Sequence, residues 1–148
     1  VGDIRHSRVA RSLAGSLQTM GASVTVVAPS TLLPIDVHGW GVGSAAGIDE
    51  ILGEVDVVEL LPFQSERGGG EVFPSAAEYV SRFGLTRSRA DRLPGDSVVM
   101  HPGPMNRGVE IDPQVADGPR ALVTHQVSNG IAVRMAVLFR LLTSEVPE

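Results

Sequence analysis

Three short runs of apolar, mostly β-branched residues alternate with segments of helical periodicity along this chain of 148 residues. The runs occupy residues 23–28, 56–61 and 97–101, and their length and composition predict buried strands. The spacing of apolar residues predicts helices at 7–20, 75–83 and 123–142, and Ser75 is placed to cap the second of them. Strands that alternate with helices form parallel sheets covered by helices. The sequence therefore predicts one Rossmann-like α/β domain over residues 1–148, with three layers and a short parallel sheet.

The composition removes several kinds of chemistry from this chain. It has no cysteine, and all twelve of its basic residues are arginine, so disulfides, thiolate nucleophiles and Schiff-base lysines are excluded. A net charge of −5 gives no basic field for nucleic acid or an anionic membrane. The sequence has no apolar run of about 18 residues and no signal-peptide pattern. We therefore expect a cytoplasmic protein without membrane or nucleic-acid partners.

The first residues resemble the end of a strand more than its beginning. Val1-Gly2-Asp3 leads at once into a helical pattern, whereas a strand normally has several residues before its turn. We therefore expect the sequence to be the C-terminal part of a longer protein.

Polar residues follow each predicted strand at the point where it ends. The segments are 2–8, 62–67 and 101–107. In open α/β sheets, ligands bind outside the carboxyl ends of the strands. The sequence therefore predicts a site at which these three segments meet.

In the first segment, Ser7 is placed to cap the following helix, and Arg5, Arg8 and Arg11 fall within two turns of it. A helix N-terminus already favours anions through its free N–H groups and its dipole. The arginines therefore indicate either a bound carboxylate or phosphate, or a solvated helix start held by salt bridges.

In the third segment, His101-Pro102-Gly103-Pro104 places two prolines around a glycine directly after a predicted strand. Proline fixes φ and lacks an N–H group, so this backbone leaves regular geometry and presents carbonyl oxygens as acceptors. Such a segment suits a ligand with an amine or amide group. The alternative is a rigid turn without a ligand, in which His101 is a hydrogen-bonded, half-buried side chain.

Five segments together resemble aspartate carbamoyltransferase, and in particular the bacterial catalytic chain. They are GDIRHSRVARS at 2–12, PSTLLP at 29–34, FPSAAEY at 73–79, MHPGPMNRGVEI at 100–111 and QVSNGIAVRMA at 126–136. The resemblance covers essentially the whole chain, in order. The HPGPMNRGVEI run is specific, because the related ornithine enzymes carry a cysteine-containing motif there and this chain has no cysteine.

The resemblance implies half of an enzyme. In this family an N-terminal domain binds carbamoyl phosphate and a C-terminal domain binds aspartate, and the sequence resembles the second. The Ser-Thr-Arg-Thr-Arg phosphate motif, the catalytic histidine and a lysine lent by a neighbouring subunit belong to the first domain, so no catalytic residue is expected here. The complete enzyme would transfer the carbamoyl group of carbamoyl phosphate to L-aspartate in pyrimidine synthesis, without a metal or organic cofactor.

The resemblance also assigns roles to individual residues of this chain. Arg8 would bind a carboxylate of aspartate, and Gln64 would help to position that substrate. Gly103 and Pro104 would offer backbone carbonyls to the carbamoyl nitrogen and the attacking amine. The family's geometry further implies a cis peptide bond between Gly103 and Pro104.

One position departs from the family pattern. The family strand continues LRVQxER, in which the arginine binds aspartate, whereas this chain reads LPFQSER at 61–67. Pro62 therefore stands where the family has an arginine, and Glu66 and Arg67 fall in the loop that closes over substrates in the family. Two alternatives follow from Pro62: a carbamoyltransferase-like binding or assembly module without catalysis, or a carbamoyltransferase for another amino acceptor.

The helix at 123–142 corresponds to the family helix that crosses back to the N-terminal domain. Its apolar residues Val127, Ile131, Leu138 and Leu142 share one face, and the family resemblance implies that this face packs on the missing domain. Gln126 is interpreted as a packing or interdomain hydrogen-bonding residue. The full chain would form the homotrimer typical of the family.

Overall fold

The computed structural model describes residues 1–63 and 75–143, which form an α/β domain as predicted. Its four short strands make two parallel pairs. β1 (Thr25–Val27) pairs with β2 (Gly43–Ala45), and β3 (Val57–Glu59) pairs with β4 (Val98–Met100).

The first two residues join the strand pairs. Gly2 donates its N–H to the carbonyl of Val27 at 2.9 Å, and the carbonyl of Val1 accepts the N–H of Leu61 at 2.8 Å. The start of the chain thus lies between β1 and β3.

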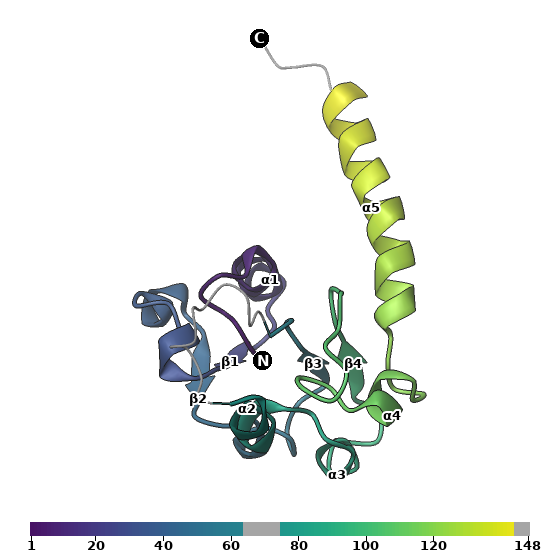
Figure 1. The fold of residues 1–148 in the computed structure, drawn as a ribbon. Coiled ribbons are helices and arrows are strands. Elements are labelled where there is room, and N and C mark those ends of the chain that lie inside the picture. Colours follow the sequence, from purple (N-terminus) through teal and green to yellow (C-terminus); the bar gives the residue numbers. More distant parts are fainter. Residues whose placement is uncertain (64–74, 144–148) are drawn as a thin grey trace.

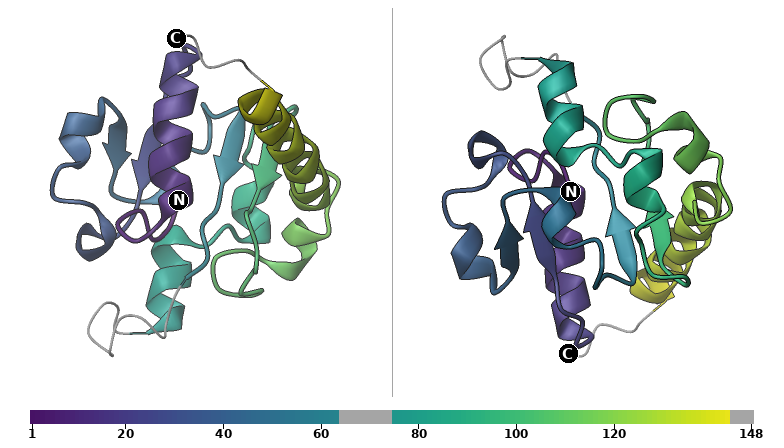
Figure 2. Two further views of the ribbon diagram at one scale, coloured as in Figure 1. Left: turned by 90° about the horizontal axis from the view of Figure 1, so that it is seen from above. Right: turned by 90° about the horizontal axis from the view of Figure 1, so that it is seen from below.

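Helices cover both sides of the strands (Figure 1 and Figure 2). On one side lie α1 (Arg8–Thr19) and α5 (Val123–Thr143), and on the other lie α2 (Ala76–Phe83) and α3 (Arg87–Ala90). A fifth, short helix is α4 (Pro113–Ala116), and single 3-10 turns occupy Ser30–Leu32, Val37–Trp40 and Ile48–Glu50. The arrangement confirms the predicted three layers.

Two clusters of buried side chains form the core. The larger packs around β3 and β4, where Val58 and Val99 are 3% and 0% exposed. The smaller contains Ile4, Val26 and Leu61 and lies under α1. The three predicted strands are present as β1, β3 and β4. Each is shorter than its apolar run, because only the central residues of the run are paired.

Local sequence signals set the helix starts. Ser7 Oγ accepts the N–H of Ala10 at 3.1 Å, and Ser75 Oγ accepts the N–H of Glu78 at 3.1 Å, so both predicted N-caps are confirmed. The sequence did not predict β2, α3 and α4. β2 reads Gly-Ser-Ala without a β-branched residue, so its pairing with β1 decides its structure.

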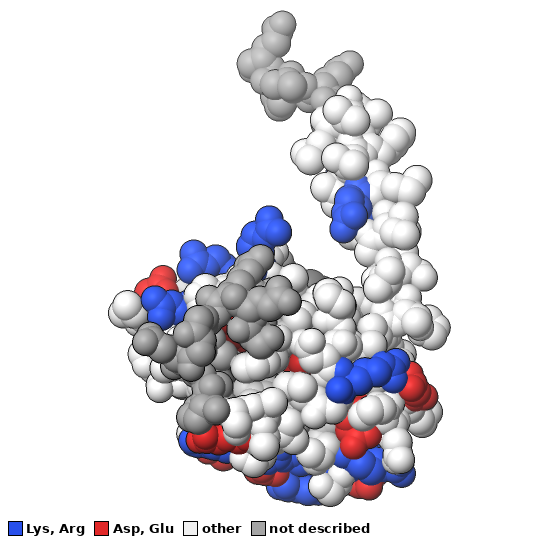
Figure 3. All heavy atoms as spheres, viewed as in Figure 1, with Lys and Arg blue, Asp and Glu red and all other residues white. Residues whose placement is uncertain are grey.

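The helix α5 projects from the body of the domain and has no buried residue (Figure 1). Its apolar side chains between Val127 and Leu142 are 51% to 83% exposed, and the helix is almost entirely white in Figure 3. These apolar side chains cover more of the circumference of α5 than the single face that the sequence predicts. Such a distribution is typical of helices that contact protein on several sides. Within residues 1–63 and 75–143, no helix combines the length and apolar character needed to cross a bilayer.

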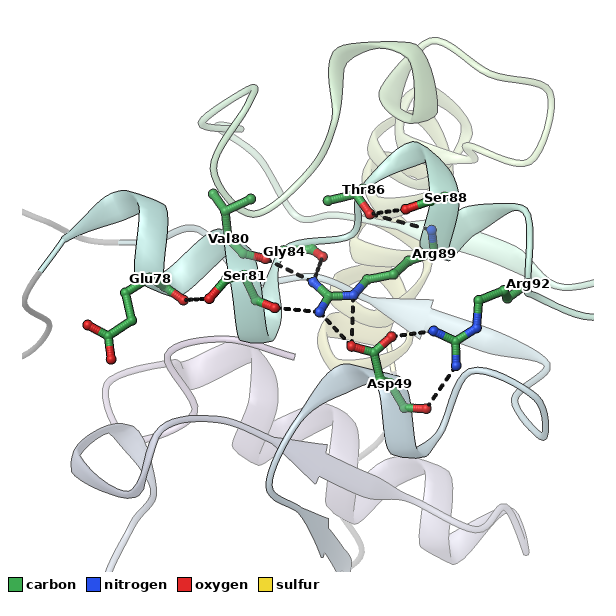
Figure 4. A network of polar contacts seen from close by, with 9 residues as sticks. All are labelled: Asp49, Glu78, Val80, Ser81, Gly84, Thr86, Ser88, Arg89 and Arg92. Atoms are coloured by element: carbon green, nitrogen blue, oxygen red, sulfur yellow. Dashed lines mark hydrogen bonds and ion pairs between the residues drawn. The ribbon is translucent and has the colours of Figure 1, made fainter.

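The C-terminal end of α2 is closed by an arginine from α3 (Figure 4). Arg89 is 9% exposed, and its guanidinium donates to the carbonyls of Val80, Ser81 and Gly84 at 2.8, 2.6 and 2.7 Å. Two further N–H groups donate to Oδ2 of Asp49, at 3.1 and 2.5 Å. All five donors of the guanidinium are therefore used.

Candidate active site

The segment 2–8 is organised by a buried carboxylate. Asp3 is 6% exposed and accepts the backbone N–H of His6 at 3.1 Å. His6 Nδ1 lies 3.0 Å from the same oxygen. Because a carboxylate only accepts hydrogen bonds, Nδ1 of His6 is the donor in this contact. The turn ends at Ser7 and leaves Arg8 exposed at the first residue of α1, where the positive end of the helix dipole adds to its charge. Basic side chains gather over α1 in Figure 3.

The segment 101–107 folds against a buried histidine–glutamate pair. His101 and Glu110 are 0% and 1% exposed, and His101 Nε2 lies 3.2 Å from Glu110 Oε1. His101 is therefore hydrogen-bonded as predicted, but fully buried rather than half-buried. Burial by itself would raise the pKa of Glu110, but hydrogen bonds from His101 and from the backbone N–H of Asn106 hold that pKa below its usual value. The carboxylate is thus ionised at neutral pH. The predicted cis peptide bond between Gly103 and Pro104 is confirmed in this segment.

Two of the three predicted segments approach Tyr79, through Gly2 and Phe63. Gly2 has φ +122°, and a Cβ at this position would lie 3.2 Å from the Tyr79 hydroxyl, so only glycine fits. The ring of Phe63 lies 4.6 Å from that of Tyr79. Burial raises the pKa of Tyr79 well above its usual value, and the negative charges of Glu110 and Asp3 raise it further. The hydroxyl therefore stays neutral between two carboxylates from different segments.

The structure describes four of the five residues predicted to bind substrates. Arg8 and Pro104 are exposed, whereas Pro62 and Gly103 are half-buried. Within the described residues, no hydrogen bond or ion pair joins Arg8 to the segment 101–107. Gln64, Glu66 and Arg67 lie outside the described residues.

Pro62 sits in an extended stretch that is fixed on both sides. The N–H of Leu61 donates to the carbonyl of Val1 at 2.8 Å, and the N–H of Phe63 lies 3.4 Å from Glu110 Oε2. The proline ring carries no charge, so this position offers no cation to a carboxylate.

Sequence reasoning missed Glu110, Asp3 and Tyr79 as parts of this arrangement. Glu110 stands between the apolar residues Val109 and Ile111, and an acidic residue flanked in this way is a signal of a paired, buried carboxylate. Tyr79 carries no such signal. Among residues 1–63 and 75–143, no cluster of three or more His, Asp or Glu side chains could hold a metal ion.

The sequence model of the aspartate/ornithine carbamoyltransferase Asp/Orn binding domain matches residues 1–141. The aspartate carbamoyltransferase catalytic subunit of Thermobifida fusca is 54% identical over 142 residues, which cover 96% of this chain and 45% of that protein. The catalytic subunit of Acidothermus cellulolyticus is 52% identical over 147 residues, covering 99% of this chain and 46% of that protein. The chain thus spans about half the length of the curated relatives it matches.

Solved structures show the same fold. Aspartate transcarbamoylase from Trypanosoma cruzi, in complex with carbamoyl phosphate, superposes with a TM-score of 0.75 at 27% identity, over 93% of this chain and 46% of that one. The catalytic subunit of M. jannaschii aspartate transcarbamoylase gives 0.70 at 28% identity, over 95% and 47%. The chain belongs to the aspartate/ornithine carbamoyltransferase family and corresponds to its Asp/Orn binding domain.

Proposed function

We propose that this chain is the aspartate-binding domain of an aspartate carbamoyltransferase. The complete enzyme would transfer the carbamoyl group of carbamoyl phosphate to the amino group of L-aspartate, giving N-carbamoyl-L-aspartate and phosphate. One observation carries the proposal: relatives named aspartate carbamoyltransferase catalytic subunit match 96% or more of this chain at 52% to 54% identity. The exposed arginine at the start of α1 fits an anionic substrate.

In this proposal the chain binds and orients substrates, and no residue of it is a catalytic residue. Arg8 forms charge-assisted hydrogen bonds with a carboxylate of aspartate, and Gln64 positions the same substrate. The backbone carbonyls of Gly103 and Pro104 accept from the carbamoyl nitrogen and the attacking amine. Holding the amine against the carbonyl carbon lowers the barrier by orientation, and the charge on the departing phosphate is stabilised by the N-terminal domain.

The exposed apolar surface of α5 supports a second part of the proposal, which is a missing N-terminal domain. Apolar side chains from Val127 to Leu142 are at least half exposed, and exposed patches of several hundred Å² mark interaction sites. The domain that would cover them is the one that binds carbamoyl phosphate. A family-type homotrimer and a cytoplasmic location belong to the same proposal.

Pro62 favours a competing function. A complex with aspartate would lack one cation at this position, so a carboxylate brought here would be left without its charged partner, which costs free energy. The chain would then be part of a non-catalytic module, or of a transferase whose amino acceptor lacks that carboxylate.

A domain exchange tests these functions. The segment of the Thermobifida fusca catalytic subunit that aligns with this chain is replaced by this chain, either unchanged or with Pro62→Arg. Loss of an arginine–carboxylate pair weakens transition-state binding by about 3–4 kcal/mol, which is a factor of several hundred in kcat/KM. Pro62→Arg should therefore raise kcat/KM for aspartate at least about tenfold and leave the KM for carbamoyl phosphate nearly unchanged.

Two results with the chimeras would favour the competing functions. Folded, trimeric chimeras that make no carbamoylaspartate with either residue would favour the non-catalytic module. If the chimera with Pro62 turns over another amino acceptor faster than aspartate, the result would favour a carbamoyltransferase for that acceptor. The 148-residue chain alone should make no carbamoylaspartate above the uncatalysed background, because the phosphate motif and the catalytic histidine are assigned to the N-terminal domain.

A further inference from the structure

The buried carboxylate of Glu110 bonds to two segments that are far apart in the sequence. Oε1 accepts the backbone N–H of Asn106 at 2.5 Å and faces His101 Nε2 at 3.2 Å. Oε2 faces the backbone N–H of Phe63 at 3.4 Å, which is the longest of the three contacts. A single side chain thereby links the exit of β3 to the segment that follows β4.

His101 extends this linkage to Gly103. The N–H of Gly103 donates to His101 Nδ1 at 2.9 Å, so Nδ1 has no proton and Nε2–H must be the donor to Glu110. The imidazole is completely buried. Its orientation is therefore determined by Glu110 at one nitrogen and by Gly103 at the other.

A second bond runs parallel to the carboxylate. The side-chain Nδ2 of Asn106 donates to the carbonyl of Phe63 at 2.9 Å. Residue 63 is thus held at its N–H by Glu110 and at its carbonyl by Asn106. The residue just before it is Pro62, which stands where the family has its aspartate-binding arginine, and the residue just after it is Gln64, which the proposed function assigns to aspartate.

We propose that Glu110 is a positioning residue, whose carboxylate fixes the backbone of residue 63 relative to the Gly103–Pro104 carbonyls through Asn106 and His101. The inference rests on the proposed function for its consequence in catalysis, but the linkage itself does not. A carboxylate suits this place because it only accepts, and all three groups facing it are donors. An amide of the same shape has one oxygen and one NH2 group, so one of these donors would face another donor.

Amide hydrogen exchange on the 148-residue chain tests the linkage in Glu110→Gln. The remaining oxygen should keep the two shorter contacts, so exchange at the Phe63 amide should accelerate about tenfold or more relative to that at Val99 in β4. The matched control is Asp117→Asn, the same chemical change in the exposed pair with Arg107, whose two N···O distances are 2.6 and 2.8 Å. The control should leave exchange at Phe63 and Gly103 unchanged.

Two further measurements keep the test decisive. If Glu110→Gln does not fold, Asn106→Ala at an exposed residue removes the parallel bond, keeps the backbone N–H that donates to Glu110, and should also accelerate exchange at Phe63. In the active Pro62→Arg chimera, Glu110→Gln should lower kcat at least about tenfold while the folded, trimeric fraction is unchanged.

The outcomes separate the inference from the proposed function. Unchanged relative exchange at Phe63 and Gly103 in the folded variants would overturn the linkage, whatever the activity of the chimera. Accelerated exchange with the parental kcat and KM would show a structural link without a role in positioning. The Pro62→Arg chimera with Glu110 in place could be inactive while Glu110→Gln accelerates exchange in the 148-residue chain. That combination would contradict the proposed function and leave the linkage standing.

Discussion

Replacing the buried Arg89 by methionine should be among the most destabilising single changes at a charged residue of this domain. Methionine keeps the length and apolar stem of the side chain but removes all five guanidinium donors. The carbonyls of Val80, Ser81 and Gly84 then lose their charged partner, and the buried carbonyl of Gly84 keeps only the N–H of Thr86 at 3.1 Å. A hydrogen bond to a charged group contributes about 1.5–3 kcal/mol, and the carbonyls closer to the surface regain part of this from water.

The ion pair with Asp49 adds little to this cost. The Asp49 side chain is 46% exposed, and solvent reduces such pairs to about 0–1 kcal/mol. The three carbonyls and the pair together give a loss of about 3 kcal/mol in the free energy of unfolding for Arg89→Met. For a domain of this size, the loss corresponds to a fall in Tm of about 10 °C.

Arg92→Met is the matched control. Arg92 also pairs with Asp49 and donates to its backbone carbonyl, but its side chain is 55% exposed and caps no helix. Its loss should cost less than about 1 kcal/mol. Urea denaturation followed by circular dichroism measures both variants, with the m-value unchanged. If Arg89→Met costs no more than Arg92→Met, closure of α2 by the guanidinium does not stabilise the domain.

The remaining predictions concern titration and exchange. Hydrogen bonds from Arg89 hold the pKa of Asp49 below its usual 3.8, so ionised Asp49 stabilises the fold above that pH. The difference in the free energy of unfolding between the parent and Asp49→Asn should therefore shrink as the pH falls below about 4. Urea denaturation at pH 7, 5 and 3 would show this. Burial and two nearby carboxylates raise the pKa of Tyr79, so absorbance at 295 nm should report its ionisation only when the chain unfolds in alkali; a reversible titration near pH 10 with native circular dichroism would contradict this. Amides of α5 (Val123–Thr143) should exchange faster than those of β3 and β4, because none of its residues is buried; equal protection would mean that α5 is covered in solution.

Features set by neighbouring residues could be predicted from the sequence, and features set by distant segments could not. Ser7 and Ser75 were predicted as caps because each bonds to a residue three positions ahead. His101 was predicted to be hydrogen-bonded, but its partner Glu110 depends on how the chain returns after the Gly103–Pro104 turn.

The same limit applies to Arg89 and to β2. The partners of Arg89 come from α2 and from the turn at Ile48–Glu50, so nothing in the run RSRA predicts them. Gly43–Ala45 has no strand propensity of its own and becomes β2 through pairing with β1. The three segments at the candidate site could be predicted because parallel strands end at a common edge, whereas the close approach of the chain to Tyr79 depends on Gly2.

The hydrogen bonds of Val1 and Gly2 connect two halves of the domain, and the candidate site contains residues of both. Arg8 belongs to the half with β1, β2 and the smaller cluster, and the 101–107 turn belongs to the half with β3, β4 and the larger cluster. Proteins open in sub-global units at free energies below that of complete unfolding. Breaking the bonds of Gly2 to Val27 and of Val1 to Leu61 would therefore separate Arg8, which we propose binds the acceptor, from the carbonyls of the turn. Separation of the two halves would therefore disrupt the site even if each half kept its secondary structure.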